Sequence, residues 1–208
     1  MLNILIADAH EIVRVGTTLL VKEIFSTAIV EQTDDFNKAL QLLDKKKYDL
    51  LILDVNIPGG DTFDMIGLAR LRQKDVPILV FSSYDEQLYS LRFLEEGANG
   101  YISKNASSHM IKKAIKTVLD KKDYVSNEVQ EQLLNIFKDK KGKQSSELAL
   151  LSNREIEIVR LLIRGVGTKE TGQILNLRKN TISTYKARIF KKLQVNNVIE
   201  LADKIKLI

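Results

Sequence analysis

The chain has 208 residues, 44% of them hydrophobic, and 32 Lys and Arg against 27 Asp and Glu, for a formal net charge of +5. This length favours two domains, and the absence of cysteine excludes disulfides and thiolate metal sites, in keeping with a reducing compartment. No apolar run approaches the roughly 18 residues that cross a bilayer, and the first run breaks at Asp8 without a preceding basic region. We therefore expect a cytoplasmic protein without a membrane partner.

The first 120 residues alternate short apolar runs with helical patterns. The runs predict strands at 4–7, 28–30, 50–53, 78–81 and 100–102. The helical patterns that follow them lie at 11–25, 35–46, 62–73, 86–95 and 107–120. Repeated strand–helix units with continuously apolar strands indicate a parallel sheet covered on both faces. The predicted fold is thus α/β, a doubly wound five-stranded parallel sheet of the flavodoxin type.

The rest of the chain is helical in pattern. A helical stretch at 127–137 leads into 138–147, which holds no apolar residue and reads as a linker. Ser152 and Glu155 are spaced as a capping box, and Gly165 and Gly167 are expected to end the helix that it starts. A short helix at 168–175, a turn at 176–177 and a longer helix from about 180 to 193 then predict a helix-turn-helix in a small all-α domain. The expected division is 1–122, a linker segment at 123–147, and 148–208.

Polar side chains stand where four of the predicted strands end. Asp8, Asp54, Ser82 and Lys104 each stand directly after, or within two residues of, one of these strands. Taken singly, Asp8 could cap a helix and Lys104 could be a surface residue. Together they are expected to converge, because the carboxyl ends of parallel strands meet at one edge of the sheet. Two carboxylates, a hydroxyl and an ammonium suit a divalent cation and a phosphoryl group.

Charge is divided unevenly between the two parts of the chain. Residues 1–120 hold 14 Lys and Arg against 17 Asp and Glu, a net of −3, whereas residues 121–208 hold 18 against 10, a net of +8. Between Arg178 and Lys192 there are six basic residues and no acid. Such a helix binds polyanions in a salt-dependent way, although charge alone also fits a solvated basic face.

Three motifs in the first part occur in the order and spacing of a known family. They are LDVNIPGGD at 53–61, VFSS at 80–83 and GANGYISK at 97–104. In the second part LSNRE at 151–155, Gly165, Lys169-Glu170, TISTYKARIFKKL at 181–193, Val195 and Leu201 follow a LuxR-type domain. The chain therefore resembles a two-component response regulator of the NarL/FixJ subclass, in which a receiver domain precedes a LuxR-type DNA-binding domain.

The resemblance assigns a role to each residue of the strand-end group. It implies that Asp54 accepts a phosphoryl group from a histidine kinase. Lys104 pairs first with this carboxylate and then with the phosphoryl oxygens. Ser82 donates a hydrogen bond to the phosphoryl group, and Tyr101 follows Ser82 inward and acts as the switch residue. Mg²⁺ is expected to be held by Asp54, by Asp8 through water and by the main-chain carbonyl of Asn56.

One departure from the family concerns the metal. The family usually has two adjacent acids after the first strand, but this chain has Asp8 followed by Ala9, which cannot ligate a cation. Mg²⁺ binding is expected to weaken, since such sites already use few carboxylates. Glu11 could reach back, but we favour a first-turn acid that complements the helix dipole. Either the receiver is still phosphorylated, or it regulates transcription independently of phosphorylation.

The resemblance also distributes roles along the basic helix. Ser183, Thr184, Lys186 and Ala187 are expected to face the major groove. Phosphate contacts are expected from Lys169, Lys179, Thr181, Tyr185, Arg188 and Lys191, and core contacts from Ile182, Ile189, Phe190 and Leu193. Arg178 and Lys179 oppose the helix dipole, so Asn180 or Thr181 is the expected cap. The expected partner is double-stranded DNA, bound as a homodimer.

Enzyme classes fit the sequence less well. An aspartate after a strand also begins the haloacid-dehalogenase motif, but that family needs a second aspartate two residues on, where this chain has Asn56. No Gly-rich phosphate loop with Gly-Lys-Ser/Thr is present. His10 and His109 are isolated in sequence and predict no metal cluster. A pure signalling scaffold is disfavoured by the complete helix-turn-helix, so the expected function is regulatory and not enzymatic.

Overall fold

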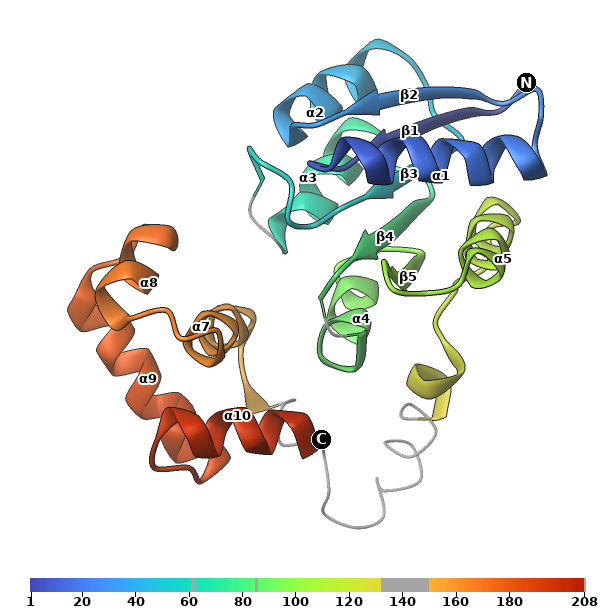
Figure 1. Ribbon diagram of the computed structural model, residues 1–208. Helices are drawn as coiled ribbons and strands as arrows, with labels where there is room; N and C mark the ends of the chain where they lie inside the picture. The colour runs from blue at the N-terminus through green and yellow to red at the C-terminus, as the bar shows by residue number, and fades with distance from the viewer. Residues whose placement is uncertain (61–62, 85, 132–149, 208) are drawn as a thin grey trace. The chain divides into compact units, whose positions relative to one another are not determined.

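The computed structural model describes residues 1–60, 63–84, 86–131 and 150–207. Its contacts divide the chain into two compact units, Met1–Leu133 and Leu134–Ile208. The N-terminal unit is a five-stranded parallel sheet in the order β2-β1-β3-β4-β5 (Figure 1). Its strands are β1 (Asn3–Ala7), β2 (Ile29–Thr33), β3 (Leu50–Leu53), β4 (Ile78–Ser82) and β5 (Gly100–Ser103). The doubly wound parallel sheet predicted from the sequence is confirmed.

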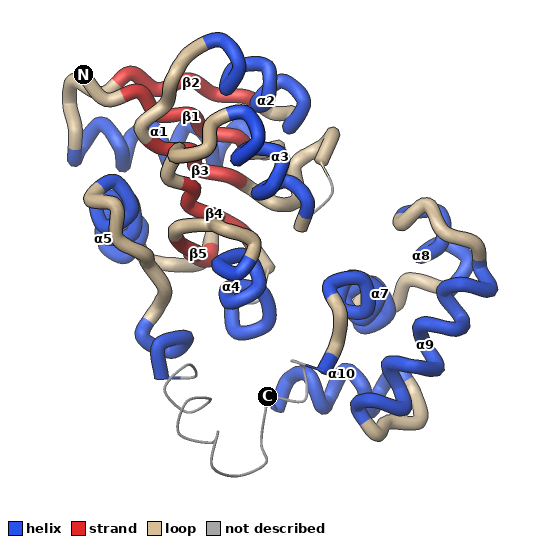
Figure 2. Tube along the Cα trace, turned by 180° about the vertical axis from the view of Figure 1, so that it is seen from behind, coloured by secondary structure: helices blue, strands red, loops and turns tan. Residues whose placement is uncertain are grey.

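Helices cover both faces of this sheet, with α1 and α5 on one face and α2, α3 and α4 on the other (Figures 1 and 2). They are α1 (Glu11–Ile24), α2 (Phe36–Lys45), α3 (Asp64–Arg72), α4 (Glu86–Glu95) and α5 (Ser108–Leu119). The sequence shows why two of them begin where they do. The side chain of Asp35 accepts from the Lys38 amide at 3.0 Å, and that of Ser107 accepts from the Met110 amide. Polar N-caps of this kind satisfy amides that the helix leaves free.

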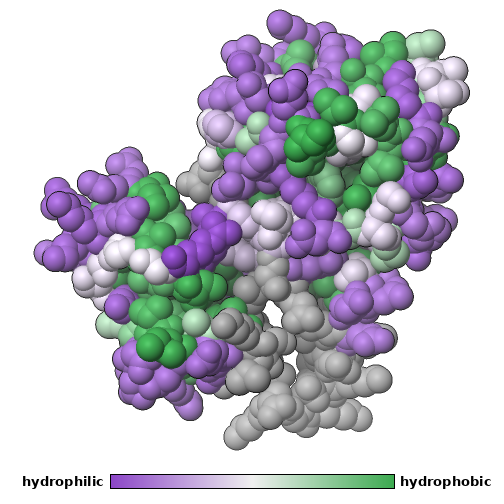
Figure 3. Space-filling view, in the orientation of Figure 1, coloured by the Kyte–Doolittle hydropathy of each residue, from purple (hydrophilic) through white to green (hydrophobic). Residues whose placement is uncertain are grey.

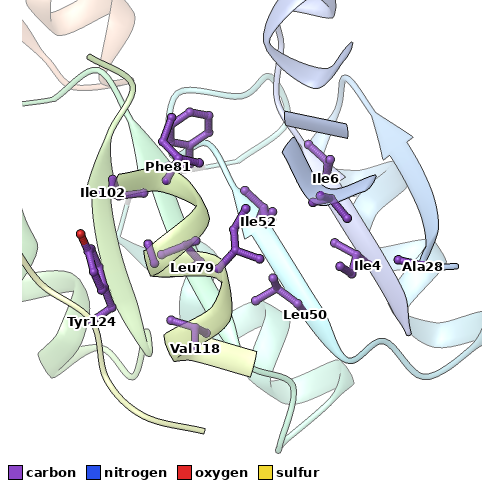
Figure 4. Close-up of a cluster of buried hydrophobic side chains, with 14 residues drawn as sticks. Ile4, Ile6, Ala28, Leu50, Ile52, Leu79, Phe81, Ile102, Val118 and Tyr124 are labelled. Carbon is purple, nitrogen blue, oxygen red and sulfur yellow. The ribbon is translucent and has the colours of Figure 1, made fainter. Parts of the chain in front are cut away.

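The core on the α1 and α5 face is a cluster of hydrophobic side chains, most of them aliphatic (Figure 4). Ile4, Ile6, Leu50 and Ile52 come from the central strands and are at most 2% exposed. Burying such a side chain contributes about 1.5–3 kcal/mol. Every residue of β3 is buried, as expected for a central strand covered on both faces. The packed sheet therefore holds its carboxyl edge in a fixed position.

The C-terminal unit consists of helices in the part of it that the structure describes. They are α7 (Asn153–Ile163), α8 (Thr168–Ile174), α9 (Lys179–Leu193) and α10 (Val198–Leu207). The predicted capping box is confirmed, because the Ser152 side chain accepts from the Glu155 amide and the Glu155 side chain accepts from the Ser152 amide. Gly165, at φ 81°, follows α7 in a left-handed conformation that favours glycine. Both α7 and α8 pack against α9.

Some of the expected segments lie outside the described residues. Residues 127–131 are helical, but the remainder of the helix predicted at 127–137 is not described, and neither is most of the predicted linker segment at 123–147. None of the helices in the described ranges has the length and hydropathy needed to cross a membrane.

The surface of the N-terminal unit mixes hydrophilic residues with hydrophobic ones (Figure 3). Helix α1 contributes Ile12, Val15 and Leu19, which are 79%, 43% and 60% exposed. Their spacing places them along one side of the helix, away from the buried residues Thr17 and Val21. The outer side of α1 is thus apolar although it faces solvent in the isolated chain.

Candidate functional site

The four polar residues predicted at the strand ends lie at the carboxyl edge of the sheet. Asp8 follows β1, Asp54 follows β3, Ser82 ends β4 and Lys104 follows β5. Both carboxylates are 2% exposed and Ser82 is fully buried. Main-chain hydrogen bonds continue the sheet past its last residues, from the Asp54 amide to the Ala7 carbonyl and from the Lys104 amide to the Ser82 carbonyl, each 2.8 Å long. The fold therefore positions these side chains through the backbone.

Lys104 joins the two carboxylates. Its Nζ lies 2.6 Å from Asp8 Oδ2 and 2.8 Å from Asp54 Oδ2. The other oxygen of each carboxylate accepts a main-chain amide two residues on, from His10 to Asp8 Oδ1 at 2.8 Å and from Asn56 to Asp54 Oδ1 at 3.0 Å. One ammonium faces two carboxylates, so this group retains one negative charge. A cation or the electron-poor phosphorus of a phosphoryl donor suits such a pocket.

The carboxylates also fit a divalent cation. Asp8 Oδ2 is buried with the Lys104 ammonium 2.6 Å away, whereas Asp8 Oδ1 lies on the side of His10. Carboxylate oxygens left with spare lone pairs are ligands that Mg²⁺ prefers. Glu11 lies exposed in the first turn of α1, in agreement with the dipole interpretation.

His10, which is isolated in the sequence, lies beside the two carboxylates in the structure. One ligand atom each from Asp8, His10 and Asp54 lies within 4.8 Å of the others. The His10 Nδ1 atom is 3.2 Å from Asp8 Oδ1. The sequence does not reveal that His10 and Asp54 are close together, because Asp54 follows a different strand. A histidine two residues after a strand-end aspartate was the available signal.

A chain of hydrogen bonds leads from Asp54 to Tyr101, and the sequence did not indicate it. The Asn56 side chain accepts from the Tyr84 hydroxyl at 2.9 Å, and the Tyr84 carbonyl accepts from the Tyr101 hydroxyl at 2.8 Å. The Tyr84 amide in turn donates to Ser82 Oγ at 3.2 Å. Tyr101 is fully buried and stacks on Phe93 of α4 at 5.9 Å. Residues 82–84 thus connect the pocket to the ring of Tyr101.

The predicted basic helix is α9, and its buried side is apolar as expected. Ile182, Ile189 and Leu193 are fully buried, while Phe190 is half-buried, with Lys186 Nζ 5.4 Å from the centre of its ring. The exposed predicted contacts are Lys169, Lys179, Ser183, Thr184, Ala187, Arg188 and Lys191. Thr181, Tyr185 and Lys186 are half-buried. The structure therefore presents all the predicted DNA-facing positions on α9 at least partly to solvent.

The start of α9 differs from the prediction. The N-cap is Arg178, and neither Asn180 nor Thr181 caps the helix. The Arg178 carbonyl accepts the amides of Thr181 and Ile182, at 2.9 and 3.2 Å, so the helix already begins at Lys179. No side chain caps it, which leaves the first amides and their partial positive charge exposed beside two basic residues.

Lys192 has a structural role that its position in a basic run hid. Its Nζ lies 2.7 Å from Glu155 Oε2 and 3.0 Å from the Leu150 carbonyl. Glu155 is itself the capping-box residue of α7, and its side chain is 4% exposed. Burial raises the pKa of the Glu155 carboxyl, but hydrogen bonds with Lys192 and Ser152 outweigh it and hold the pKa below the usual 4.5. This ion pair fastens the end of α9 to the start of α7.

Comparisons with known proteins agree with this architecture. Residues 4–116 match the response regulator receiver domain, and residues 149–205 match the LuxR family of bacterial regulatory proteins. The Fimbriae Z protein of Escherichia coli K12 is 33% identical over 206 residues, covering 99% of this chain and 96% of that protein. The oxygen regulatory protein NreC of Staphylococcus carnosus is 30% identical over 208 residues, covering 97% and 95%.

Solved structures give the same result. RcsB from Salmonella enterica serovar Typhimurium, bound to the promoter rprA in the presence of phosphomimetic BeF₃⁻, superposes with a TM-score of 0.74. It is 26% identical, with 99% of this chain and 98% of that chain covered. The strand order, the acidic pocket and the C-terminal helices therefore have a common explanation. This chain belongs to the response regulators of the NarL/FixJ type, which join a receiver domain to a LuxR-type DNA-binding domain.

Proposed function

We propose that this chain regulates transcription in the cytoplasm, accepting a phosphoryl group on Asp54 from a histidine kinase and binding double-stranded DNA as a homodimer. The observation that carries the proposal is the buried Asp54 carboxylate beside the Lys104 ammonium, at the carboxyl edge of a receiver sheet. Relatives of known structure support the DNA partner, because RcsB dimers have been solved on DNA. Dimeric regulators of this kind read paired half-sites.

In the proposed transfer, an oxygen of Asp54 attacks the phosphorus of a phosphohistidine. The new O–P bond forms as the P–N bond breaks, the imidazole leaves with its electron pair, and Asp54 becomes an acyl phosphate. Lys104, already 2.8 Å from this carboxylate, would follow the developing charge onto the phosphoryl oxygens. Fixed positive charge in a pocket that excludes water is the main source of stabilisation for such a step.

Ser82 and Tyr101 would read the new charge. Ser82 Oγ now accepts from the Tyr84 amide, and turning to donate to a phosphoryl oxygen would disturb residues 82–84. Because the Tyr84 carbonyl holds the Tyr101 hydroxyl, that displacement would pass to Tyr101 and to Phe93 of α4. The surface beside α4 and β5 would thus change with the state of Asp54.

Receiver domains generally bind Mg²⁺, and here Asp8, Asp54 and the main-chain carbonyl of Asn56 would hold it. When bound, it neutralises charge on the phosphoryl oxygens. Ala9 offers no ligand where the family usually has a second acid, so we propose that the affinity for Mg²⁺ is reduced.

Replacing Ala9 by aspartate is expected to raise the affinity for Mg²⁺ about tenfold or more. An added carboxylate near a divalent cation is worth upward of about 1–2 kcal/mol even in a solvated site. Isothermal titration of the metal-free protein with MgCl₂ measures this, and Ala106→Asp, a half-buried alanine after β5, serves as the matched control. Unchanged Mg²⁺ affinity in Ala9→Asp would show that position 9 does not limit the site.

A second function has an observation in its favour. Ala9 provides no ligand where the family usually has a second metal-binding acid. This supports an atypical receiver that regulates transcription independently of phosphorylation. The two functions share the DNA-binding unit and differ in whether Asp54 controls it.

Fluorescence anisotropy with labelled mixed-sequence duplexes tests both parts of the proposal. The chain is expected to bind in a salt-dependent way, and beryllofluoride with Mg²⁺ is expected to change the affinity of the wild type but not of Asp54→Asn. Asp64→Asn, an exposed acid on α3, is the matched control and should behave as the wild type does. If beryllofluoride left the affinity for DNA unchanged, the phosphorylation-independent function would be favoured. If the chain showed no salt-dependent binding to DNA, its role as a DNA-binding regulator would be refuted.

Lys179→Glu is expected to weaken binding to all duplexes alike and to lower the slope of log Kobs against log salt by about 1, because one phosphate contact is lost. The helix itself should gain about 0.3–1 kcal/mol, since an acid in the first turn complements its dipole. Lys116→Glu, an equal charge reversal on α5, is the control. A loss confined to one sequence would speak against a phosphate contact.

A further inference from the structure

His10 lies between the pocket and solvent, and its ring is hydrogen-bonded to Asp8. It is the N-cap residue of α1, yet its side chain makes no capping hydrogen bond. The imidazole instead lies with its Nδ1 3.2 Å from Asp8 Oδ1, and its side chain is 62% exposed whereas Asp8 is 2% exposed. A largely exposed ring, held by one hydrogen bond, therefore borders a buried carboxylate.

The separation between these two atoms suits shared metal ligation. Two ligands bound at roughly 2.1 Å and at right angles are about 3 Å apart, close to the spacing of Nδ1 and Oδ1 here. An oxygen of Asp54 completes a group of three ligand atoms within 4.8 Å of one another. One coordination sphere would require the exposed His10 ring to turn toward the two carboxylates.

The Lys104 ammonium does not occupy this side of Asp8. Lys104 contacts Oδ2 of Asp8 and Oδ2 of Asp54, whereas His10 meets Oδ1 of Asp8. The ammonium and a cation can thus use different oxygens of the same carboxylate. Two carboxylates against one ammonium also leave a negative charge for a divalent ion to neutralise.

The kinds of ligand decide which cation is favoured. Mg²⁺ requires oxygen ligands and usually retains several waters, whereas imidazole suits borderline first-row transition ions. Ala9 removes an oxygen ligand, and His10 supplies a nitrogen. We propose that His10 ligates through Nδ1 beside Asp8 and Asp54, so that the pocket binds a divalent first-row transition ion more tightly than Mg²⁺. This inference rests on the proposed phosphoacceptor pocket and names its cation.

The test uses Co²⁺ as the probe and the full chain without an affinity tag. Isothermal titrations with CoCl₂ and MgCl₂ are expected to give Co²⁺ an advantage of at least about tenfold, the scale on which a lost partner weakens a metal site. His10→Ala should lose that advantage while keeping its Mg²⁺ affinity. His109→Ala, the only other histidine of the chain, should retain both affinities and controls for surface binding.

Paramagnetic NMR supplies a readout that a structural role of His10 would not move. Co²⁺ bound to Nδ1 shifts the exchangeable Nε2 proton of the same ring far outside the normal range. That signal is expected in the wild type and in His109→Ala, and it should vanish in His10→Ala. Equal Co²⁺ affinity in wild type and His10→Ala, or no shifted imidazole proton in the wild type, would overturn the proposal. Neither titration involves phosphoryl transfer or DNA, so failure here leaves the proposed function standing.

Discussion

Lys104→Met is expected to destabilise the metal-free N-terminal unit by roughly 2–4 kcal/mol, because breaking a buried ion pair leaves uncompensated charge. In the native pocket the ammonium contacts both Asp8 and Asp54, at 2.6 and 2.8 Å, and both carboxylates are 2% exposed. Without it, two buried carboxylates would face each other with no cation. Hydrogen exchange of the β1 and β3 amides in EDTA measures the loss without a contribution from the C-terminal unit.

Two companion variants separate charge from packing. Lys104→Met combined with Asp8→Asn should recover most of the lost stability, because only one carboxylate remains. Lys112→Met removes an ion pair with Glu23 whose partners are 34% and 59% exposed, and it should cost less than about 1 kcal/mol. Added Mg²⁺ should also protect Lys104→Met more than the wild type. If Lys104→Met were as stable as the wild type in EDTA, the Lys104 ammonium would not be the group that compensates the negative charge of Asp8 and Asp54.

Glu155→Ala is expected to destabilise the C-terminal unit by roughly 2–4 kcal/mol, since it removes both a capping-box residue and the partner of Lys192. Glu155 Oε2 accepts hydrogen bonds from the Ser152 amide and from Lys192 Nζ, each 2.7 Å long. Its loss would free the start of α7 and the end of α9 together. Hydrogen exchange should show loss of protection in both helices and none in β1. Protection lost in α7 alone would mean that the Lys192 pair contributes little.

The Glu155 carboxylate also makes the stability of the C-terminal unit depend on pH. Because the folded pKa of Glu155 lies below its unfolded value, its contribution to stability is fully present above about pH 4.5 and is lost as the pH falls through the folded pKa. Glu155→Gln keeps a side chain that can cap but cannot ionise. We expect the stability difference between wild type and Glu155→Gln to shrink as the pH is lowered from 6 to 3, as followed by α7 exchange. A constant difference across this range would contradict the ion-pair account.

The sheet and its polar edge could be predicted because the relevant signals are local. Continuous apolar runs such as Leu50–Leu53 mark strands buried on both faces, and parallel pairing places the residues that follow them at one edge. Asp8, Asp54 and Lys104 meet for that reason. The Ser152 capping box was equally local, since both of its hydrogen bonds join residues three positions apart.

The parts that were missed depend on side chains arriving from distant elements. His10 looked isolated because Asp54 is 44 residues away in sequence, and Lys192 looked like one more basic residue because Glu155 lies on another helix. The Tyr84 hydroxyl, which follows the next strand, donates to Asn56. The spacing of residues in the sequence does not predict this contact. The cap of α9 was misplaced because propensity favoured a polar side chain, whereas the Arg178 carbonyl already closes the first turn.

The most direct test of the central claim is the intact mass of the protein after incubation with acetyl phosphate and a divalent cation, followed by mapping of the modified residue. The account predicts one added phosphoryl group, located on Asp54, formed in the wild type and absent from Asp54→Asn. Replacing Mg²⁺ by EDTA should reduce it. A wild-type protein that gains no phosphoryl group with either Mg²⁺ or Co²⁺, or gains it at a residue other than Asp54, would contradict the account.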